Sequence, residues 1–118
     1  MELDDALVRD IVEEGEEDYL DISTIAYLYK LEHDISREQL DPLATEIAAE
    51  LIRRGLIIPG TLDNGFHPWN LTTEESVATL SRDVQLALRE SPMLSPGQVC
   101  WFDITEKARR EYPPTDAD

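Results

Sequence analysis

The sequence has few of the residue types on which catalysis, metal binding or disulfide cross-linking depend. Its only cysteine, Cys100, has no intrachain disulfide partner and stands in an apolar run typical of a buried thiol. The two histidines, His33 and His67, have neither the spacing of a metal pair nor that of a nucleophile and its base. The sequence contains no glycine-rich phosphate loop and no paired-cysteine zinc pattern. We therefore expect no cofactor, no metal and no enzymatic activity.

Long hydrophobic runs are also missing. No apolar stretch approaches the roughly 20 residues that a membrane-spanning helix needs. Residues 1–5 are acidic and lack the basic segment followed by an apolar one that marks a secretion signal. From this pattern we expect no membrane partner and a cytoplasmic location.

Basic residues are scarce. Ten Lys and Arg stand against 26 Asp and Glu, which gives a net charge of −16. A polyanion repels nucleic-acid phosphates and attracts basic protein surfaces, although acidity can also serve solubility alone. Residues 1–21 contain ten of the acidic residues and one basic residue, Arg9. This concentration favours a binding role, because charge that serves only solubility would be spread along the chain.

The first part of the chain has the pattern of two helices. Apolar side chains recur every three or four residues, which predicts a helix over residues 3–14 that Gly15 ends. Asp21 or Ser23 can cap a second helix that ends near His33.

The third predicted helix, over residues 42–54, has the clearest start and stop signals. Asp41 can cap it, Pro42 suits its first turn, and Gly55 can adopt the left-handed conformation that stops it. A separate turn of helix is predicted from Ser36, with a break near Asp41 where the proline follows.

The second half alternates between strands and helices. Its predicted elements are a strand over 56–59, a turn at Pro59-Gly60, an aromatic loop over 61–69, a helix capped by Thr72 that ends at Glu90, a strand over 99–104, a helix capped by Thr105 that ends at Tyr112, and a disordered tail over 113–118. In the last strand, Trp101 and Phe102 should point to opposite faces. Together these elements predict one mostly helical α+β domain over residues 1–118.

Two stretches resemble winged helix-turn-helix proteins. They read Leu51-Ile52-x-x-Gly55-Leu56-Ile57 and Trp101-Phe102-Asp103-Ile104-Thr105-Glu106-Lys107-Ala108-Arg109. The second is similar to the family's last wing strand and closing helix, with Ala108 where glycine is common. The resemblance implies a winged-helix-like three-helix core and a short β-hairpin wing, here interrupted by a helical insertion over residues 66–97. The chain is also similar to small acidic bacterial proteins of that shape, some of which are immunity proteins that neutralise a partner toxin.

These observations favour a non-catalytic protein-binding module. We predict an immunity protein or inhibitor that binds and neutralises a basic partner toxin, such as a nuclease. The residues predicted to contact this partner are Asp10, Glu13, Glu14, Glu16, Glu17, Asp18, Asp21, Phe66 and Trp69. The two aromatic residues have an alternative role, which is to cover the core.

Two other functions are compatible with the sequence. In a winged-helix DNA-binding regulator, the helix over residues 42–54 would enter the major groove. The charge argues against nucleic acid, because that helix carries Glu46 and Glu50, and its arginines stand at the end that usually faces away from the groove. In a structural dimerisation module, an apolar surface around Phe66, Trp69 and Trp101 would join two copies.

Overall fold

The structure is a computed structural model that describes residues 1–114. Its elements, in chain order, are α1 (Asp5–Glu17), α2 (Ile22–Glu32), α3 (Arg37–Arg53), β1 (Ile57–Leu62), β2 (Phe66–Pro68), α4 (Thr73–Glu90), β3 (Trp101–Ile104) and α5 (Glu106–Glu111). Helices dominate, and the three strands form one antiparallel sheet. The predicted α+β, mostly helical class is confirmed.

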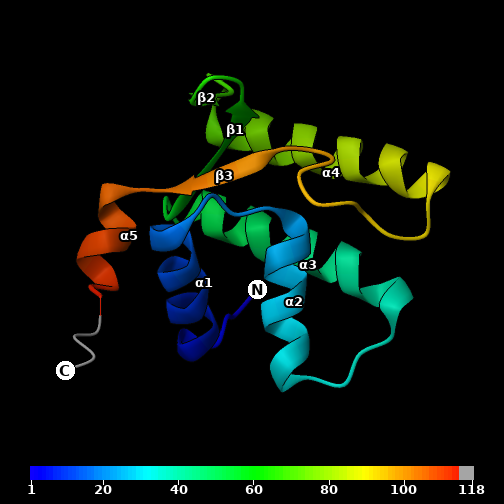
Figure 1. The fold of residues 1–118 in the computed structure, drawn as a ribbon, viewed down its shortest axis with the longest axis horizontal. Helices are drawn as coiled ribbons and strands as arrows, with labels where there is room; N and C mark the ends of the chain where they lie inside the picture. Colours follow the sequence, from blue (N-terminus) through cyan, green and yellow to red (C-terminus); the bar gives the residue numbers. More distant parts are fainter. Residues whose placement is uncertain (115–118) are drawn as a thin grey trace.

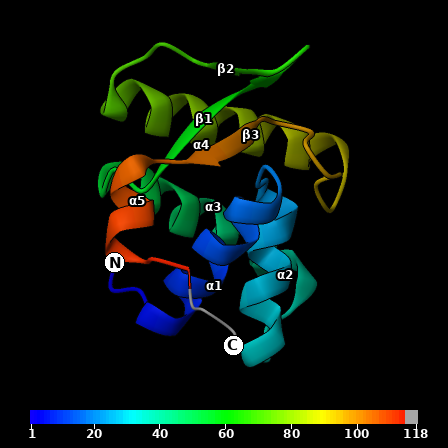
Figure 2. The ribbon, with the colours of Figure 1, turned by 60° about the vertical axis from the view of Figure 1, so that its left-hand side comes forward.

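One hydrophobic core connects the helices to the sheet. Its largest fully buried side chains include Phe102 of β3, Ile11 of α1, Ile25 of α2 and Leu51 of α3. Figure 1 shows α1, α2 and α3 grouped on one side of the strands, with α4 on the other side in that view. After the rotation in Figure 2, α4 passes behind β1 and β3. Phe102 is buried and Trp101 is partly exposed, so the predicted opposite orientations of these neighbours are confirmed.

The sheet has the order β2-β1-β3, so β1 is the central strand, and α4 lies in the chain between the two outer strands. Leu62 pairs with Phe66 in the β1–β2 hairpin. Ile58 pairs with Asp103 across β1 and β3. Beyond β3, the backbone of Leu20 exchanges two hydrogen bonds with Phe102, of 2.9 and 2.7 Å. The segment between α1 and α2 is therefore attached directly to the sheet.

Several predicted helix boundaries are confirmed by their hydrogen bonds. Asp21 caps α2, since its carboxylate accepts from the Thr24 amide at 3.0 Å. Thr72 and Glu75 form the capping box of α4, and these hydrogen bonds lower the pKa of Glu75. Gly55 follows α3 with φ of 74°, which is the left-handed conformation that the stop requires.

The predicted helix end at Gly15 is wrong. Helix α1 continues through Gly15 to Glu17. A Cβ at this glycine would stand 2.5 Å from Cγ2 of Ile104, and Leu20 is the next nearest side chain. Gly15 therefore lets α1 pack closely on the sheet, which a local reading of glycine as a helix stop misses.

The predicted start and break around Asp41 and Pro42 are also wrong. Helix α3 runs without interruption from Arg37 to Arg53 with Pro42 inside it, and Ser36 makes no side-chain capping bond. A proline inside a helix removes one backbone hydrogen bond and crowds the preceding turn. Helix α3 nevertheless buries eight of its side chains, so tertiary packing outweighs the local break.

The predicted turn at Pro59-Gly60 is wrong as well. Strand β1 continues through both residues to Leu62, and the chain reverses instead at residues 63–65, where Asn64 and Gly65 have positive φ. The expected aromatic loop is therefore largely a hairpin. The predicted insertion over residues 66–97 contains β2 in addition to α4, so it is not wholly helical.

β1 and β3 pair as the two strands of a wing would, but this pairing is common to many small sheets, and the winged-helix assignment stays a prediction. Of the predicted tail, residues 113 and 114 follow α5 without regular structure, and residues 115–118 lie outside the described part of the chain. Within residues 1–114, none of the helices combines the length and apolar character needed to cross a bilayer.

Candidate functional site

The end of α1 carries a group of exposed carboxylates. Glu14, Glu16, Glu17 and Asp18 are all exposed, and the last turn of α1 contains no basic residue. The carboxyl end of a helix is its negative pole, so carboxylates there destabilise the helix. Within residues 1–114, Glu14 and Glu17 have no side-chain hydrogen bond or ion pair. This arrangement disfavours folding and leaves the charges available to an external cation.

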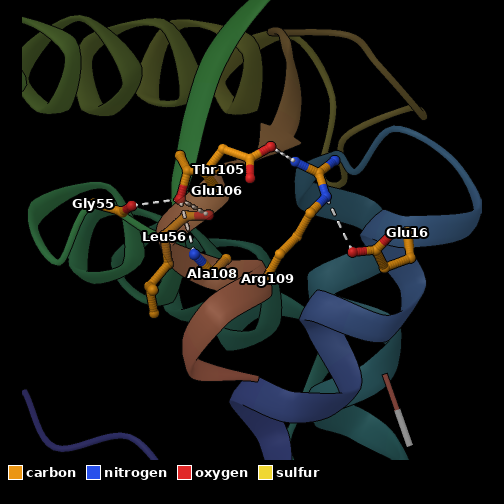
Figure 3. A network of polar contacts seen from close by, with 7 residues as sticks. All are labelled: Glu16, Gly55, Leu56, Thr105, Glu106, Ala108 and Arg109. Carbon is orange, nitrogen blue, oxygen red and sulfur yellow. Dashed lines mark hydrogen bonds and ion pairs between the residues drawn. The ribbon is translucent and has the colours of Figure 1, made fainter. Parts of the chain in front are cut away.

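One carboxylate of this group has a cationic partner within the chain. Arg109 of α5 lies 3.2 Å from Glu16 and 3.4 Å from Glu106 (Figure 3). Thr105 positions this short helix, because its hydroxyl accepts from the Ala108 amide and donates to the carbonyl oxygen of Gly55 at 2.7 Å. The strand-to-helix motif at the end of the chain thus brings a guanidinium to the end of α1.

A hollow of about 310 Å³ connects the end of α1 to the sheet. Its lining residues are Gly15, Glu16, Glu17, Asp18, Tyr19, Asp103 and Arg109. Asp103 comes from β3, so the sheet adds a carboxylate to those of α1. The hollow is open and acidic, with a tyrosine at its border.

The aromatic residue Phe66 lies against the acidic segment. Its ring stacks on that of Tyr19, with centroids 5.3 Å apart and planes 9° apart. The absent side chain of Gly60 makes room for this ring, since a Cβ there would stand 2.5 Å from Cζ of Phe66. The two predicted binding elements, the acidic segment and the aromatic loop, therefore meet at one place through residues 47 positions apart in sequence.

Trp69 lies apart from this contact. It is half-buried, packs against the hydrophobic core, and lines a separate hollow with Ile52, Ile57 and Leu71. Its amide donates to the carbonyl oxygen of Pro59 at 3.1 Å. The alternative role in covering the core is therefore confirmed for Trp69.

Asp21 is buried, with 2% of its surface exposed, so it does not belong to the exposed acidic group. Its carboxylate accepts from the Gly97 amide at 2.6 Å and from the hydroxyl of Thr24 at 2.7 Å. Asp21 thus fastens the segment before β3 to the start of α2. The prediction that it contacts a partner does not fit this burial.

The remaining predicted acids lie along α1. Asp10 is exposed, and Glu13 is half-buried and has an interaction partner within the structure. Asp10, Glu14 and Glu17 are spaced by four and three residues, so they follow one side of the helix. Their like charges repel each other along that side, which adds to the unfavourable position at the helix end.

The described residues offer little for catalysis. Burial, together with the charges of Asp83 and Asp21, raises the pKa of the Cys100 thiol from 9.0 to about 12, so it is a poor nucleophile. His33 stacks on Tyr29 at the exposed end of α2, and His67 contacts the carbonyl oxygen of Asp63. No group of three or more potential metal ligands comes together within residues 1–114.

Sequence reasoning missed Tyr19 and Asp103 as members of the site. The available signal was the alternation in β3, where Asp103 stands between the buried residues Phe102 and Ile104 and therefore faces away from the core.

Comparison with known proteins adds no identification. No protein-family model matches the chain. Searches of curated proteins and of solved structures give no significant match.

Proposed function

We propose that this chain is a non-catalytic protein-binding module, and that it acts as an immunity protein or inhibitor that neutralises a basic partner toxin. One observation carries the proposal: Glu14, Glu16, Glu17 and Asp18 gather at the end of α1, where carboxylates are unfavourable to the helix, and within residues 1–114 Glu16 is the member of this group that has an ion-pair partner. A basic protein surface would supply the missing cations. A nuclease toxin fits this chemistry, because its nucleic-acid cleft must be basic.

The charge of −16 gives such an inhibitor a kinetic advantage. Long-range attraction accelerates the encounter of oppositely charged proteins, and salt screens this attraction. Apolar contacts at the centre of the interface then set the lifetime of the complex. The Tyr19–Phe66 stack provides an aromatic contact surface beside the carboxylates.

The position of α3 favours this function over DNA binding. Helix α3 buries residues on several sides, and α4 lies along it, with Arg53 and Glu74 3.9 Å apart. A hollow between these two helices includes Glu46 and Glu50, which would face the phosphates of an approaching duplex. A helix enclosed in this way has little free surface for the major groove.

The test combines capture with a pair of matched variants. The full chain is immobilised at low salt and exposed to lysate of its native host, and the captured protein is identified and purified. Association rates are then compared for Glu14→Lys/Glu17→Lys and for Glu32→Lys/Glu90→Lys. Both variants change the net charge equally and place lysines near helix ends, but only the first alters the end of α1.

We expect a basic protein that associates more slowly as salt rises. The α1 variant should associate about tenfold more slowly than the wild type at low salt, and the control variant should lose much less. Equal decreases in the association rates of the two variants would indicate that net charge alone sets the rate, whatever the position of the carboxylates. Retention of random duplex DNA at low salt would support the regulator instead.

A further inference from the structure

One face of the sheet lies on the side opposite the hydrophobic core. Directly paired strand residues share a face, as do alternate residues along one strand. The pairs Ile58 with Asp103, Gly60 with Trp101, and Leu62 with Phe66 therefore share this face. We call it the open sheet face, and its side chains are Ile58, Leu62, Phe66, Trp101, Asp103 and the adjoining Tyr19.

No helix of the described chain crosses in front of this face. In Figure 2, α4 passes behind β1 and β3, and the front of both strands is uncovered. Ile58 is 37% exposed, and Tyr19, Phe66 and Trp101 keep part of their surfaces in solvent. Clustered, partly exposed aromatic rings are typical of the centre of a protein interface.

The glycines under the rings show how this face is built. Phe66 lies across Gly60, and Trp101 lies so close to Gly97 that a Cβ there would clash with its indole ring. Both rings therefore lie low over the backbone. The result is a shallow aromatic surface, which suits a flat planar group better than a bulky side chain.

Carboxylates border the aromatic surface on one side. Asp103 belongs to the open sheet face, and it lines the same hollow as Glu17 and Asp18 of the α1 end. The chain's own Arg109 already reaches this hollow and pairs with Glu16 there, as Figure 3 shows. The site therefore accommodates a guanidinium beside Tyr19.

We propose that the open sheet face is the docking surface for a partner protein that presents arginine side chains to it. This inference rests on the proposed function and names the chemistry of the partner residues. A guanidinium can stack on an aromatic ring through its plane and donate two hydrogen bonds to a carboxylate at its edge. Lysine offers a point charge without the flat surface, so the face distinguishes the two cations.

A second copy of this chain is a poorer occupant. It would bring another net charge of −16 and place carboxylates against carboxylates at the border of the face. Charge complementarity therefore selects a basic protein over a homodimer.

The test uses two short basic peptides of equal length and charge, one carrying arginines and the other lysines in the same positions. Each is titrated into the full, isotope-labelled chain, and the signals of Tyr19, Phe66 and Trp101 are followed by nuclear magnetic resonance. The variant Tyr19→Leu removes one ring. Tyr27→Leu is the control, since Tyr27 is an exposed tyrosine on α2 that does not belong to the open sheet face, although it lines a hollow with Glu14. Signal dispersion reports whether each variant is folded.

We expect the arginine peptide to bind about fivefold more tightly, the factor that ~1 kcal/mol of stacking gives. Tyr19→Leu should abolish this preference and Tyr27→Leu should keep it. If both peptides bind equally and shift only the α1 end, the inference is overturned while the proposed function stands. If neither peptide binds at low salt, both the inference and the proposed function are overturned. Concentration-dependent dimerisation through the aromatic signals would overturn the inference in favour of a second copy.

Discussion

Two sets of carboxylates in this protein have opposite surroundings. Asp21 and Asp41 are buried, and they accept hydrogen bonds from the amides of Gly97 and Leu94, at 2.6 and 2.8 Å. The acids at the end of α1, such as Glu17, are exposed and lie at the unfavourable end of a helix. The first set fastens the segment before β3 to α2 and α3. Among residues 1–114, the second set makes no comparable buried hydrogen bonds, and for this reason we propose that it binds a partner.

The largest expected effect is on the chemical labelling of Cys100. This residue follows the segment before β3 that Asp21 and Asp41 bind through Gly97 and Leu94. Because its pKa is raised from 9.0 to about 12, the folded protein contains about a thousandfold less thiolate at pH 8 than an exposed cysteine would. Iodoacetamide should therefore label Cys100 very slowly in the native protein and rapidly in urea, as measured by mass spectrometry. In Asp21→Ala, native labelling should become faster for two reasons: the segment opens more often, and the charge of Asp21 no longer raises the pKa of the thiol.

The pH dependence has a defined sign. The thiol stays protonated in the folded state up to about pH 12, whereas the unfolded chain releases this proton from pH 9. Its contribution to stability is therefore complete below pH 9 and is lost between pH 9 and about 12.

Rapid native labelling at pH 8, at a rate unaffected by Asp21→Ala, would show that the aspartates do not secure the segment.

The second effect is on stability. Asp41→Ala should lower the free energy of unfolding by about 2 kcal/mol, because the buried amide of Leu94 loses a charged acceptor. Asp21→Ala should cost a similar amount, since it removes a helix cap as well as the bond to Gly97. Urea denaturation measures both.

Two controls accompany these variants. Asp41→Asn keeps an acceptor oxygen and should lose less than the alanine variant. Asp34→Ala removes an exposed carboxylate and should change stability by less than about 0.5 kcal/mol. If Asp34→Ala lowered the free energy of unfolding as much as Asp41→Ala does, the distinction between buried and exposed carboxylates would be wrong.

The smallest expected effect is an increase in the free energy of unfolding. Glu17→Lys should raise the free energy of unfolding by about 0.5 kcal/mol, because it puts a cation at the carboxyl end of α1 and relieves repulsion from neighbouring acids. The same variant should slow association with a basic partner. Glu32→Lys at the end of α2 should stabilise the protein by a similar amount without slowing its association with the partner. Urea denaturation measures the stability of each variant, and binding kinetics measure its association rate. A destabilised Glu17→Lys would mean that the carboxylate supports the fold.

Local patterns predicted most of the elements. Short-range signals such as Asp21 before α2, the capping box of Thr72, and Gly55 after α3 depend on residues within a few positions, so sequence alone suffices for them. The errors at Gly15 and Pro42 have a different origin. Contacts with distant elements decided the local conformation there, and these contacts leave no local pattern.

The candidate site shows the same limit. The exposed acids of α1 follow from charge clustering, but the burial of Asp21 depends on Gly97, which lies 76 residues later. Likewise, the stacking of Tyr19 on Phe66 requires the hairpin and the open position at Gly60. Residue type indicated what could bind a cation, and only the tertiary structure shows which carboxylates remain accessible.

The attachment of Leu20 to β3 also bears on self-assembly. Exposed strand edges invite further strands to add, which is a route to fibrils. Here Leu20 occupies part of one edge, and the opposite edge is the three-residue β2, which ends in a proline that has no amide hydrogen to donate. Neither border offers a long template for polymerisation. The uncovered aromatic surface is therefore not accompanied by a strand edge long enough to recruit further copies of the chain.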